Sequence, residues 1–143
     1  MPIKTIEFTD LEKELLATKK RFQEALAPEL GKAYIIAITR DGCPACERQK
    51  PKLDQLAKAA ARTHKDRVVF TRIHVKYRKD MEKESARSKE VLAHYFYPTN
   101  LILVRTKDRG ATELYRSAAP TMSELKRHIG IAVKLAEMLK SRG

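Results

Sequence analysis

The sequence predicts an α/β fold: a central four-stranded mixed sheet flanked by helices on both faces, with an extra helix near the N-terminus. Segments with helical periodicity alternate with short β-rich runs along the chain. Two of these runs enclose one helix within roughly 40 residues, the spacing of a strand–helix–strand unit with parallel strands. Two later runs are separated by a tight turn, which adds an antiparallel hairpin.

Length and composition agree with one folded domain. The chain has 143 residues, 43% hydrophobic and 34% charged, so we expect a single domain over residues 1–143 with a charged exterior. No run approaches the ~18 consecutive apolar residues of a membrane span. The first residues also lack the apolar core of a signal peptide. We therefore expect a cytoplasmic protein that does not enter membranes.

The net charge of +12 is distributed unevenly. Residues 43–80 contain eleven Lys/Arg against four Asp/Glu, whereas residues 1–42 contain seven of each. Such a basic protein surface is typical of the ion-pair-rich exterior of thermophilic proteins. Attraction of acidic partners or nucleic acid is the alternative interpretation. Nucleic acid is the weaker option because no aromatic-basic interleaving or recognition motif accompanies the charge.

The N-terminal third predicts a helix and then a strand. The helix begins at Thr9-Asp10-Leu11-Glu12, which has the form of a capping box, and ends at residues 28–31. Its apolar positions fall on one face: Leu11, Leu15, Phe22 and Leu26. The continuous apolar run at 32–39 predicts a strand that is buried on both faces.

The middle of the chain predicts two further helices around a strand. Residues 43–63 have a helical apolar stripe, and residues 67–75 are β-rich. A more polar helix is predicted over 80–96. The mixed charges of residues 76–90 indicate a solvent-exposed helix face, and contact with a partner is the alternative function.

The C-terminal part predicts a hairpin and a last helix. Strands at 100–104 and 112–116 are separated by a turn at 107–110. A second capping box, Thr121-Met122-Ser123-Glu124, begins the helix. Its apolar stripe consists of Leu125, Ile129, Ala132, Ala136 and Leu139.

Both cysteines of the chain, Cys43 and Cys46, lie where the first predicted strand turns into a helix. A helix N-terminus presents unpaired amides and a partial positive charge, which favour a thiolate. We expect Cys43 to be the outer, reactive thiol and Cys46, one turn further in, to be the resolving thiol. Pro44 suits the first turn of a helix, where an amide hydrogen is not needed.

The motifs in this order resemble the thioredoxin superfamily from about Lys32 to Leu139. Cys-Pro-Ala-Cys follows an apolar strand, Pro51 comes five residues after the second cysteine, and Tyr97-Pro98-Thr99 precedes a strand. The resemblance implies a protein thiol–disulfide oxidoreductase that uses the Cys43–Cys46 pair and needs no other cofactor. It also implies a cis bond at Pro98 and a thioredoxin-reductase-type electron donor. The substrate-binding residues that it implies are Gly42, Pro44, Tyr97, Pro98 and Thr99.

The sequence departs from that family at several positions. The family has a buried aspartate six residues before the first cysteine and a tryptophan directly before it; this chain has Ala37 and Gly42. Glu47 is a candidate substitute for the missing proton relay, although an acidic residue at a helix start also simply favours the dipole. Residues 105–114 lack the paired glycines of a glutathione site.

Three other functions compete with the oxidoreductase. A redox-silent adaptor would use the same fold without thiol chemistry. A zinc protein would normally need four ligands, and the single cysteine pair is accompanied by histidines at spacings that match no motif. We therefore expect no metal. Binding of nucleic acid has only the charge in its favour.

Overall fold

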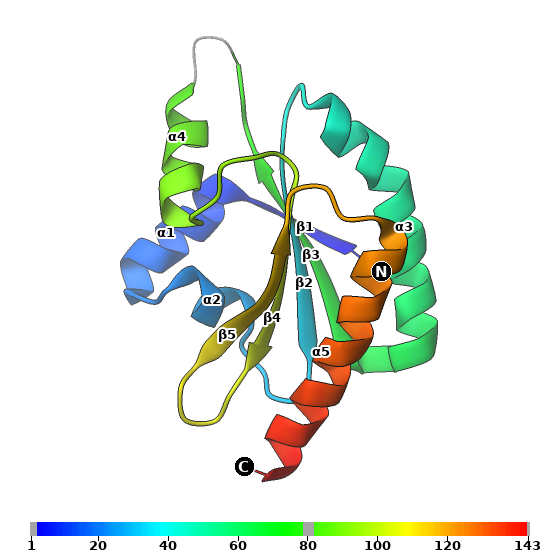
Figure 1. Cartoon of the computed structure of the whole chain (residues 1–143). Coiled ribbons are helices and arrows are strands. Elements are labelled where there is room, and N and C mark those ends of the chain that lie inside the picture. Colours follow the sequence, from blue (N-terminus) through cyan, green and yellow to red (C-terminus); the bar gives the residue numbers. More distant parts are fainter. Residues whose placement is uncertain (1–2, 79–81, 143) are drawn as a thin grey trace.

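The computed structural model describes residues 3–78 and 82–142 and contains one mixed sheet of five strands in the order β1-β3-β2-β4-β5 (Figure 1). The strands are β1 (Ile3–Glu7), β2 (Ala33–Arg40), β3 (Val68–Val75), β4 (Thr99–Arg105) and β5 (Ala111–Ser117). β1, β3 and β2 are parallel, and β4 and β5 are added antiparallel to them. The prediction of four strands is wrong by one, because β1 was not predicted.

Two layers of helices cover the sheet (Figure 1). One face carries α3 (Pro44–His64) and α5 (Met122–Arg142), and the other carries α1 (Phe8–Thr18), α2 (Phe22–Leu26) and α4 (Glu82–Val91). The central strand β2 contributes to both cores, since Ile35 faces α3 and α5 while Ile36 faces the opposite layer. The predicted strand with two buried faces is therefore confirmed.

The first helix differs from the prediction at its start and in its middle. It begins at Phe8, so Thr9 lies inside the first turn and is not the N-cap residue. The N-cap residue is Glu7, and no side chain caps the N-terminal end of the helix. β1 continues as far as Glu7, and the fully buried Phe8 anchors the helix directly after it. The chain then breaks at Lys19, which has a left-handed φ of 58°, and resumes as α2. The predicted single helix is thus two helices.

The predicted polar helix is shorter and less exposed than expected. α4 covers Glu82–Val91, and its predicted start at residues 80 and 81 lies outside the described residues. Three of its polar side chains are buried against the molecule: Glu84, Ser85 and Ser88. Glu84 is satisfied there because its Oε2 accepts the backbone N–H of Lys76 at 2.6 Å. The predicted solvent-exposed face of mixed charge is present on α4, but the buried polar stripe on its other face was not predicted.

The C-terminal elements follow the prediction closely. Thr121 caps α5, with its Oγ1 accepting the N–H of Glu124 at 3.0 Å. The β4–β5 hairpin closes through the Thr106 N–H, which donates to the Gly110 carbonyl at 2.8 Å. Gly110 has a φ of +76°, a conformation that glycine adopts without strain. Of the helices described, none has the length and apolarity required to cross a membrane.

Candidate active site

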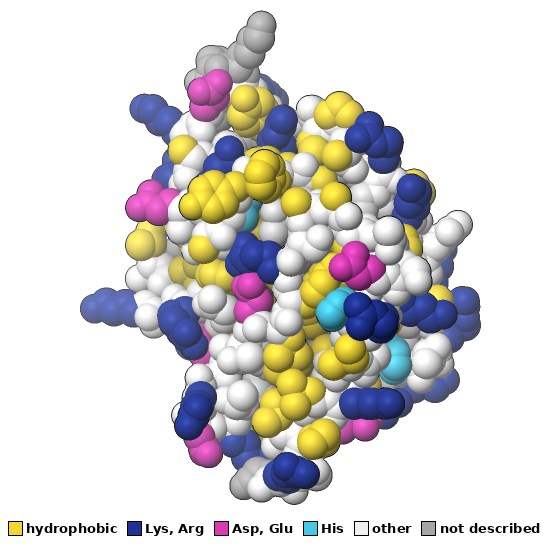
Figure 2. Space-filling model, viewed as in Figure 1, with side chains coloured by type: hydrophobic (Ala, Val, Ile, Leu, Met, Phe, Trp, Pro, Cys, Tyr) yellow, Lys and Arg dark blue, Asp and Glu magenta, His cyan; other side chains and the backbone are white. Residues whose placement is uncertain are grey.

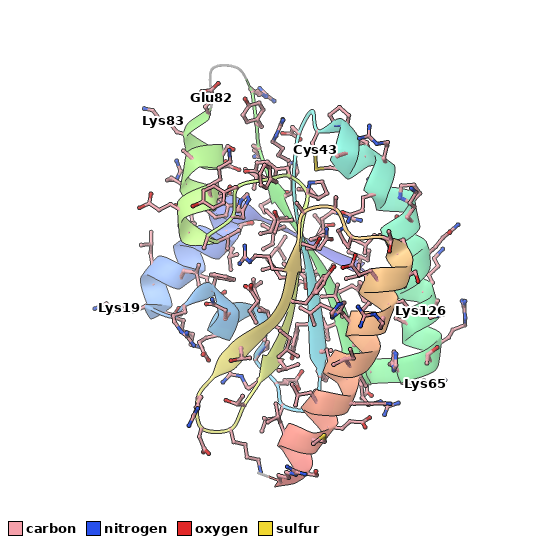
Figure 3. The ribbon with its side chains drawn as sticks, viewed as in Figure 1. Lys19, Cys43, Lys65, Glu82, Lys83 and Lys126 are labelled. Atoms are coloured by element: carbon pink, nitrogen blue, oxygen red, sulfur yellow. A yellow bond between two sulfur atoms is a disulfide. The ribbon has the colours of Figure 1, made fainter. Side chains whose placement is uncertain are left out.

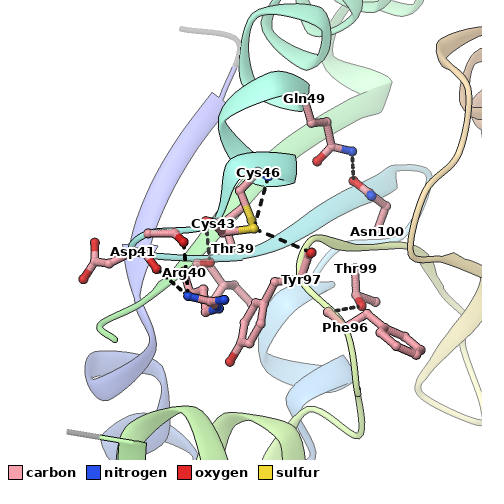
Figure 4. Close-up of a disulfide and its surroundings, with 12 residues drawn as sticks. Thr39, Arg40, Asp41, Cys43, Cys46, Gln49, Phe96, Tyr97, Thr99 and Asn100 are labelled. Atoms are coloured by element: carbon pink, nitrogen blue, oxygen red, sulfur yellow. Dashed lines mark hydrogen bonds between the residues drawn. A yellow bond between two sulfur atoms is a disulfide. The ribbon is translucent and has the colours of Figure 1, made fainter. Parts of the chain in front are cut away.

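Cys43 and Cys46 form a disulfide at the N-terminal end of α3 (Figures 3 and 4). Their Cα atoms are 5.2 Å apart, within the usual range for a disulfide. Cys43 is the N-cap residue of α3, and its Sγ accepts the backbone N–H of Cys46 at 3.2 Å. A helix amide thus contacts the sulfur of Cys43, where an amide would stabilise a thiolate.

The turn before the helix sets this geometry. β2 ends at Arg40, and the N–H of Asp41 donates to the Val75 carbonyl at 3.2 Å, which holds the turn on β3. Gly42 has a φ of +63°, a left-handed conformation that favours glycine over other residues. Pro44 then occupies the first turn of α3, as predicted. Pro51 lies inside α3 without ending it.

Burial does not distinguish the two cysteine residues as the sequence suggested. Cys43 is 4% exposed and Cys46 is 6% exposed, so neither cysteine is the outer one in the disulfide form. The expectation that Cys43 is more accessible is wrong for this state. The difference between the cysteines lies in their hydrogen bonds, because the helix amide points to the sulfur of Cys43.

The loop before β4 lies against the disulfide. The Tyr97–Pro98 peptide bond is cis, as predicted. The carbonyl oxygen of Tyr97 is 3.6 Å from the Sγ of Cys43, although the two residues are 54 positions apart in the sequence (Figure 4). Thr99 is buried, and its hydroxyl donates to the Phe96 carbonyl at 2.6 Å, so its side chain braces the loop.

A buried polar network holds this loop on α4. The hydroxyl of Tyr97 lies 3.0 Å from that of Ser85 and 2.7 Å from that of Ser88. The Ser88 hydroxyl is 3.2 Å from Nε2 of His94, whose Nδ1 is 3.3 Å from the Phe96 carbonyl oxygen. The side chain of Tyr97 therefore points to α4, and its backbone faces the disulfide.

His94 is neutral at physiological pH. It is 2% exposed, and this burial lowers the pKa of the imidazole to about 4. The hydrogen bond with the Phe96 carbonyl acts against this lowering of the pKa, and nearby Lys89 and Arg116 contribute to it. The sequence analysis missed His94 and its partners. The sequence contained one signal for this polar network. Ser85 and Ser88 are spaced i, i+3, so two small polar residues lie on one face of a predicted helix.

A polar hollow of about 280 Å³ lies on the Cys46 side of the disulfide. Its lining includes Cys46, Glu47, Lys50 and Arg72. Glu47 is exposed in the first turn of α3 and lines this hollow together with Cys46. Cys46 is the thiol whose proton Glu47 was predicted to accept. Ala37 pairs with Arg72 across β2 and β3, so a cationic residue stands beside the position of the missing aspartate.

An ion-pair cluster ties the active-site turn to the first two strands of the sheet. His74 Nδ1 is 2.9 Å from a carboxylate oxygen of Glu7, and its Nε2 is 2.7 Å from one of Asp41. Partial burial lowers the pKa of His74, but these carboxylates outweigh it and raise the pKa above its ordinary value. The hydrogen bond from His74 in turn lowers the pKa of Asp41. His74 is thus a structural residue that links β1 with the turn.

Arg40 lies over two aromatic rings. Figure 4 shows it beside one of them, Tyr97, next to the disulfide. Its guanidinium carbon is 4.2 Å from the ring centre of Tyr77 and 5.6 Å from that of Tyr97. Its Nη1 donates to the Asp41 carbonyl at 2.8 Å and to the Gly42 carbonyl at 3.4 Å. The sequence analysis did not single out Arg40, whose position depends on residues distant in sequence.

A groove of about 200 Å³ lies on the other side of the disulfide. Pro98 and Ala45 line it, together with two cationic residues of α3, Arg48 and Lys52. The sequence analysis missed both cations, although residues 45, 48 and 52 share one helix face. Of the predicted substrate-binding residues, the structure places Pro98 in this groove and Gly42 at the polar hollow.

Metal ligands do not gather in the described residues. Over 3–78 and 82–142, no group of three or more His, Cys, Asp or Glu side chains has an arrangement that could hold a metal ion.

No protein-family model and no curated protein sequence matches the chain. The structure is similar to that of Trichomonas vaginalis thioredoxin, with a TM-score of 0.59 and 14% identity over 91% of this chain and 96% of the other. Chlamydomonas reinhardtii thioredoxin f2 gives a TM-score of 0.58 and 16% identity, over 90% of this chain and 94% of the other. Fasciola hepatica thioredoxin gives 0.56 and 16%, over 90% and 98%. The chain therefore has the thioredoxin fold.

Proposed function

We propose that the protein is a thiol–disulfide oxidoreductase that exchanges disulfides with protein substrates through Cys43 and Cys46. The observation that carries the proposal is the disulfide at the start of α3, next to the cis Tyr97–Pro98 bond. The thioredoxin fold of the chain agrees with it. The pair itself is the redox group, so the reaction needs no further cofactor.

In the reducing direction, the Cys43 thiolate attacks one sulfur of a substrate disulfide. A bond forms between Cys43 and the substrate, the substrate disulfide breaks, and its second sulfur leaves as a thiolate. Cys46 then loses its proton and attacks the Cys43 sulfur, which releases the other substrate sulfur and forms the Cys43–Cys46 disulfide. The substrate gains two electrons and the cysteine pair loses two.

The surroundings of the pair support these roles. The N–H of Cys46 lies 3.2 Å from the Cys43 sulfur and would stabilise it as a thiolate. Glu47 lines the hollow next to Cys46 and is the candidate acceptor for the proton that Cys46 must lose. Pro44, Gly42 and the loop of Tyr97, Pro98 and Thr99 would position the substrate backbone.

The cycle closes when an electron donor reduces the pair again. A cytoplasmic thioredoxin-reductase-type enzyme is the donor we propose, since it would supply two electrons to a disulfide of this kind. Protein disulfides are the substrates, and neither a membrane nor nucleic acid takes part in the reaction.

Trapping experiments test the proposal. Without Cys46 the mixed disulfide cannot be resolved, so Cys46→Ser should accumulate a covalent complex with an oxidised protein substrate such as insulin. Cys43→Ser is the matched control and should accumulate none, because it removes the attacking thiol. Non-reducing electrophoresis separates the two results. Failure of the wild-type protein to reduce insulin, together with no trapped complex, would refute the oxidoreductase function.

A further inference from the structure

The groove beside the disulfide combines an apolar lining with positive charge. Its apolar residues come from α3, the loop before β4 and the connection into α5: Ala45, Pro98, Ala118, Ala119, Pro120 and Met122. Arg48 and Lys52 are its cationic residues, and both side chains are exposed. No Asp or Glu is among the described residues that line it.

The positive charge of this groove is not neutralised within the described part of the chain. No carboxylate there lies within ion-pair distance of Arg48 or Lys52. The hollow on the other side of the disulfide differs, because Asp41 and Glu47 line it along with its cations. The two sides of the disulfide therefore differ in that carboxylates offset part of the positive charge in the hollow, whereas the described lining of the groove on the side of Pro98 contains none.

The loop that contributes Pro98 to the groove also carries two exposed aromatic side chains. Tyr95 is 81% exposed and Phe96 is 66% exposed, and both belong to the loop that contacts Cys43. Figure 2 shows hydrophobic side chains gathered over the loop between α4 and β4, with Lys and Arg near them. A segment that binds here would meet apolar surface and positive charge together.

We propose that the groove selects acidic polypeptide segments, and this rests on the oxidoreductase function proposed above. The segment carries a cystine, places apolar side chains against the lining of the groove and pairs carboxylates flanking its cysteine with Arg48 and Lys52. Exposed pairs of this kind are individually weak and are screened by salt. Selection therefore comes from two cations acting together beside the reacting sulfur, and it weakens as ionic strength rises.

Two disulfide-bridged peptides of equal length and equal apolar content test the selectivity. One carries Asp and Glu on both sides of its cysteines, and the other carries Lys at the same positions. The pre-reduced protein is mixed with each peptide in excess, and kcat/KM follows from the appearance of peptide thiols. The wild type should prefer the acidic peptide by about tenfold or more at 20 mM NaCl, and this ratio should fall toward one at 0.5 M NaCl.

Variants assign the preference to the groove. Arg48→Gln/Lys52→Gln should lower the ratio about tenfold, equivalent to about 1.4 kcal/mol. Lys58→Gln/Arg62→Gln is the matched control, because it removes an exposed Lys and Arg with the same i, i+4 spacing on α3, two to three turns further along. This control should keep the wild-type ratio.

The outcomes separate the two proposals. Equal loss of the ratio in both double variants would show that net charge, and not the groove, selects the substrate, and would overturn the inference. A ratio that Arg48→Gln/Lys52→Gln leaves unchanged would overturn it as well. In both cases reduction of the peptides would leave the oxidoreductase function standing, whereas a wild type that reduces neither peptide would refute that function and the selectivity with it.

Discussion

Protonation of His94 should destabilise the protein as the pH falls from 7 to 5. The folded pKa of His94 is about 4, against an ordinary value of 6.5, so the folded state excludes the proton that the unfolded state accepts. Above pH 6.5 His94 is neutral in both states and does not lower the free energy of unfolding. As the pH falls from 6.5 toward 4, only the unfolded state takes up the proton, and the free energy of unfolding falls. From these two pKa values, the free energy of unfolding falls by about 2 kcal/mol between pH 7 and pH 5.

Other histidines titrate in the same range, so the wild-type curve alone does not isolate His94. The raised pKa of His74 stabilises the folded state at acid pH and opposes the effect. Burial lowers the pKa of His64, which acts in the same direction as His94. Comparison with His94→Gln removes these contributions, since both proteins share them.

Urea denaturation of the oxidised protein at pH 7, 6 and 5 measures the effect. The stability of His94→Gln should fall with acidification by about 2 kcal/mol less than that of the wild type. His74→Gln should do the opposite and lose more stability than the wild type, because it lacks the group that gains a proton on folding. Parallel curves for wild type and His94→Gln would refute the assignment of a buried, neutral imidazole beneath the active-site loop.

Two further substitutions test the surroundings of the disulfide. Tyr97→Phe removes the hydroxyl that contacts Ser85 and Ser88, and should lower the free energy of unfolding by about 1–2 kcal/mol in urea at pH 7. An unchanged unfolding midpoint would contradict the role of this network. Glu47→Gln should slow resolution of a Cys43 mixed disulfide on the order of tenfold near pH 6.5 if Glu47 accepts the Cys46 proton, as single-turnover quenching would measure. Equal rates would restrict Glu47 to its effect on the helix dipole.

The strands and helices with strong periodicity could be predicted from the sequence. β2 is a continuous apolar run because both of its faces are buried, and α5 carries both an apolar stripe and a side-chain cap at Thr121. β1 had no such signal. It is a short edge strand of mixed polarity that forms only by pairing with β3, with Ile3 opposite Phe70, and a local pattern does not contain that partner.

The break between α1 and α2 was also hidden. Lys19 adopts the left-handed conformation where neither Gly nor Pro marks the chain, and the surrounding residues are good helix formers. Burial of Phe22 and Leu26 in the core places α2, and so tertiary contacts decide where the first helix ends.

The position of the candidate site was predicted from the sequence, and its surroundings only incompletely. The cysteine motif and the Tyr97–Pro98 pair could be read directly, because each is a local signal. Arg40, His94 and the cations of the groove were missed, since their importance arises from neighbours that folding brings together. The burial of Ser85 and Ser88 on α4 was not predicted, because small polar residues in a highly charged segment are typical of a protein surface.

The parallel pairing of β1 with β3 imposes an order on folding during synthesis. Residues 3–7 leave the ribosome well before their partner strand at residues 68–75, which follows only after about sixty more residues have been translated. The β4–β5 hairpin, by contrast, can close as soon as it emerges. β1 is therefore held unpaired until residues 68–75 have been made, and a nascent chain stalled before residue 68 would lack the strand on which β1 docks.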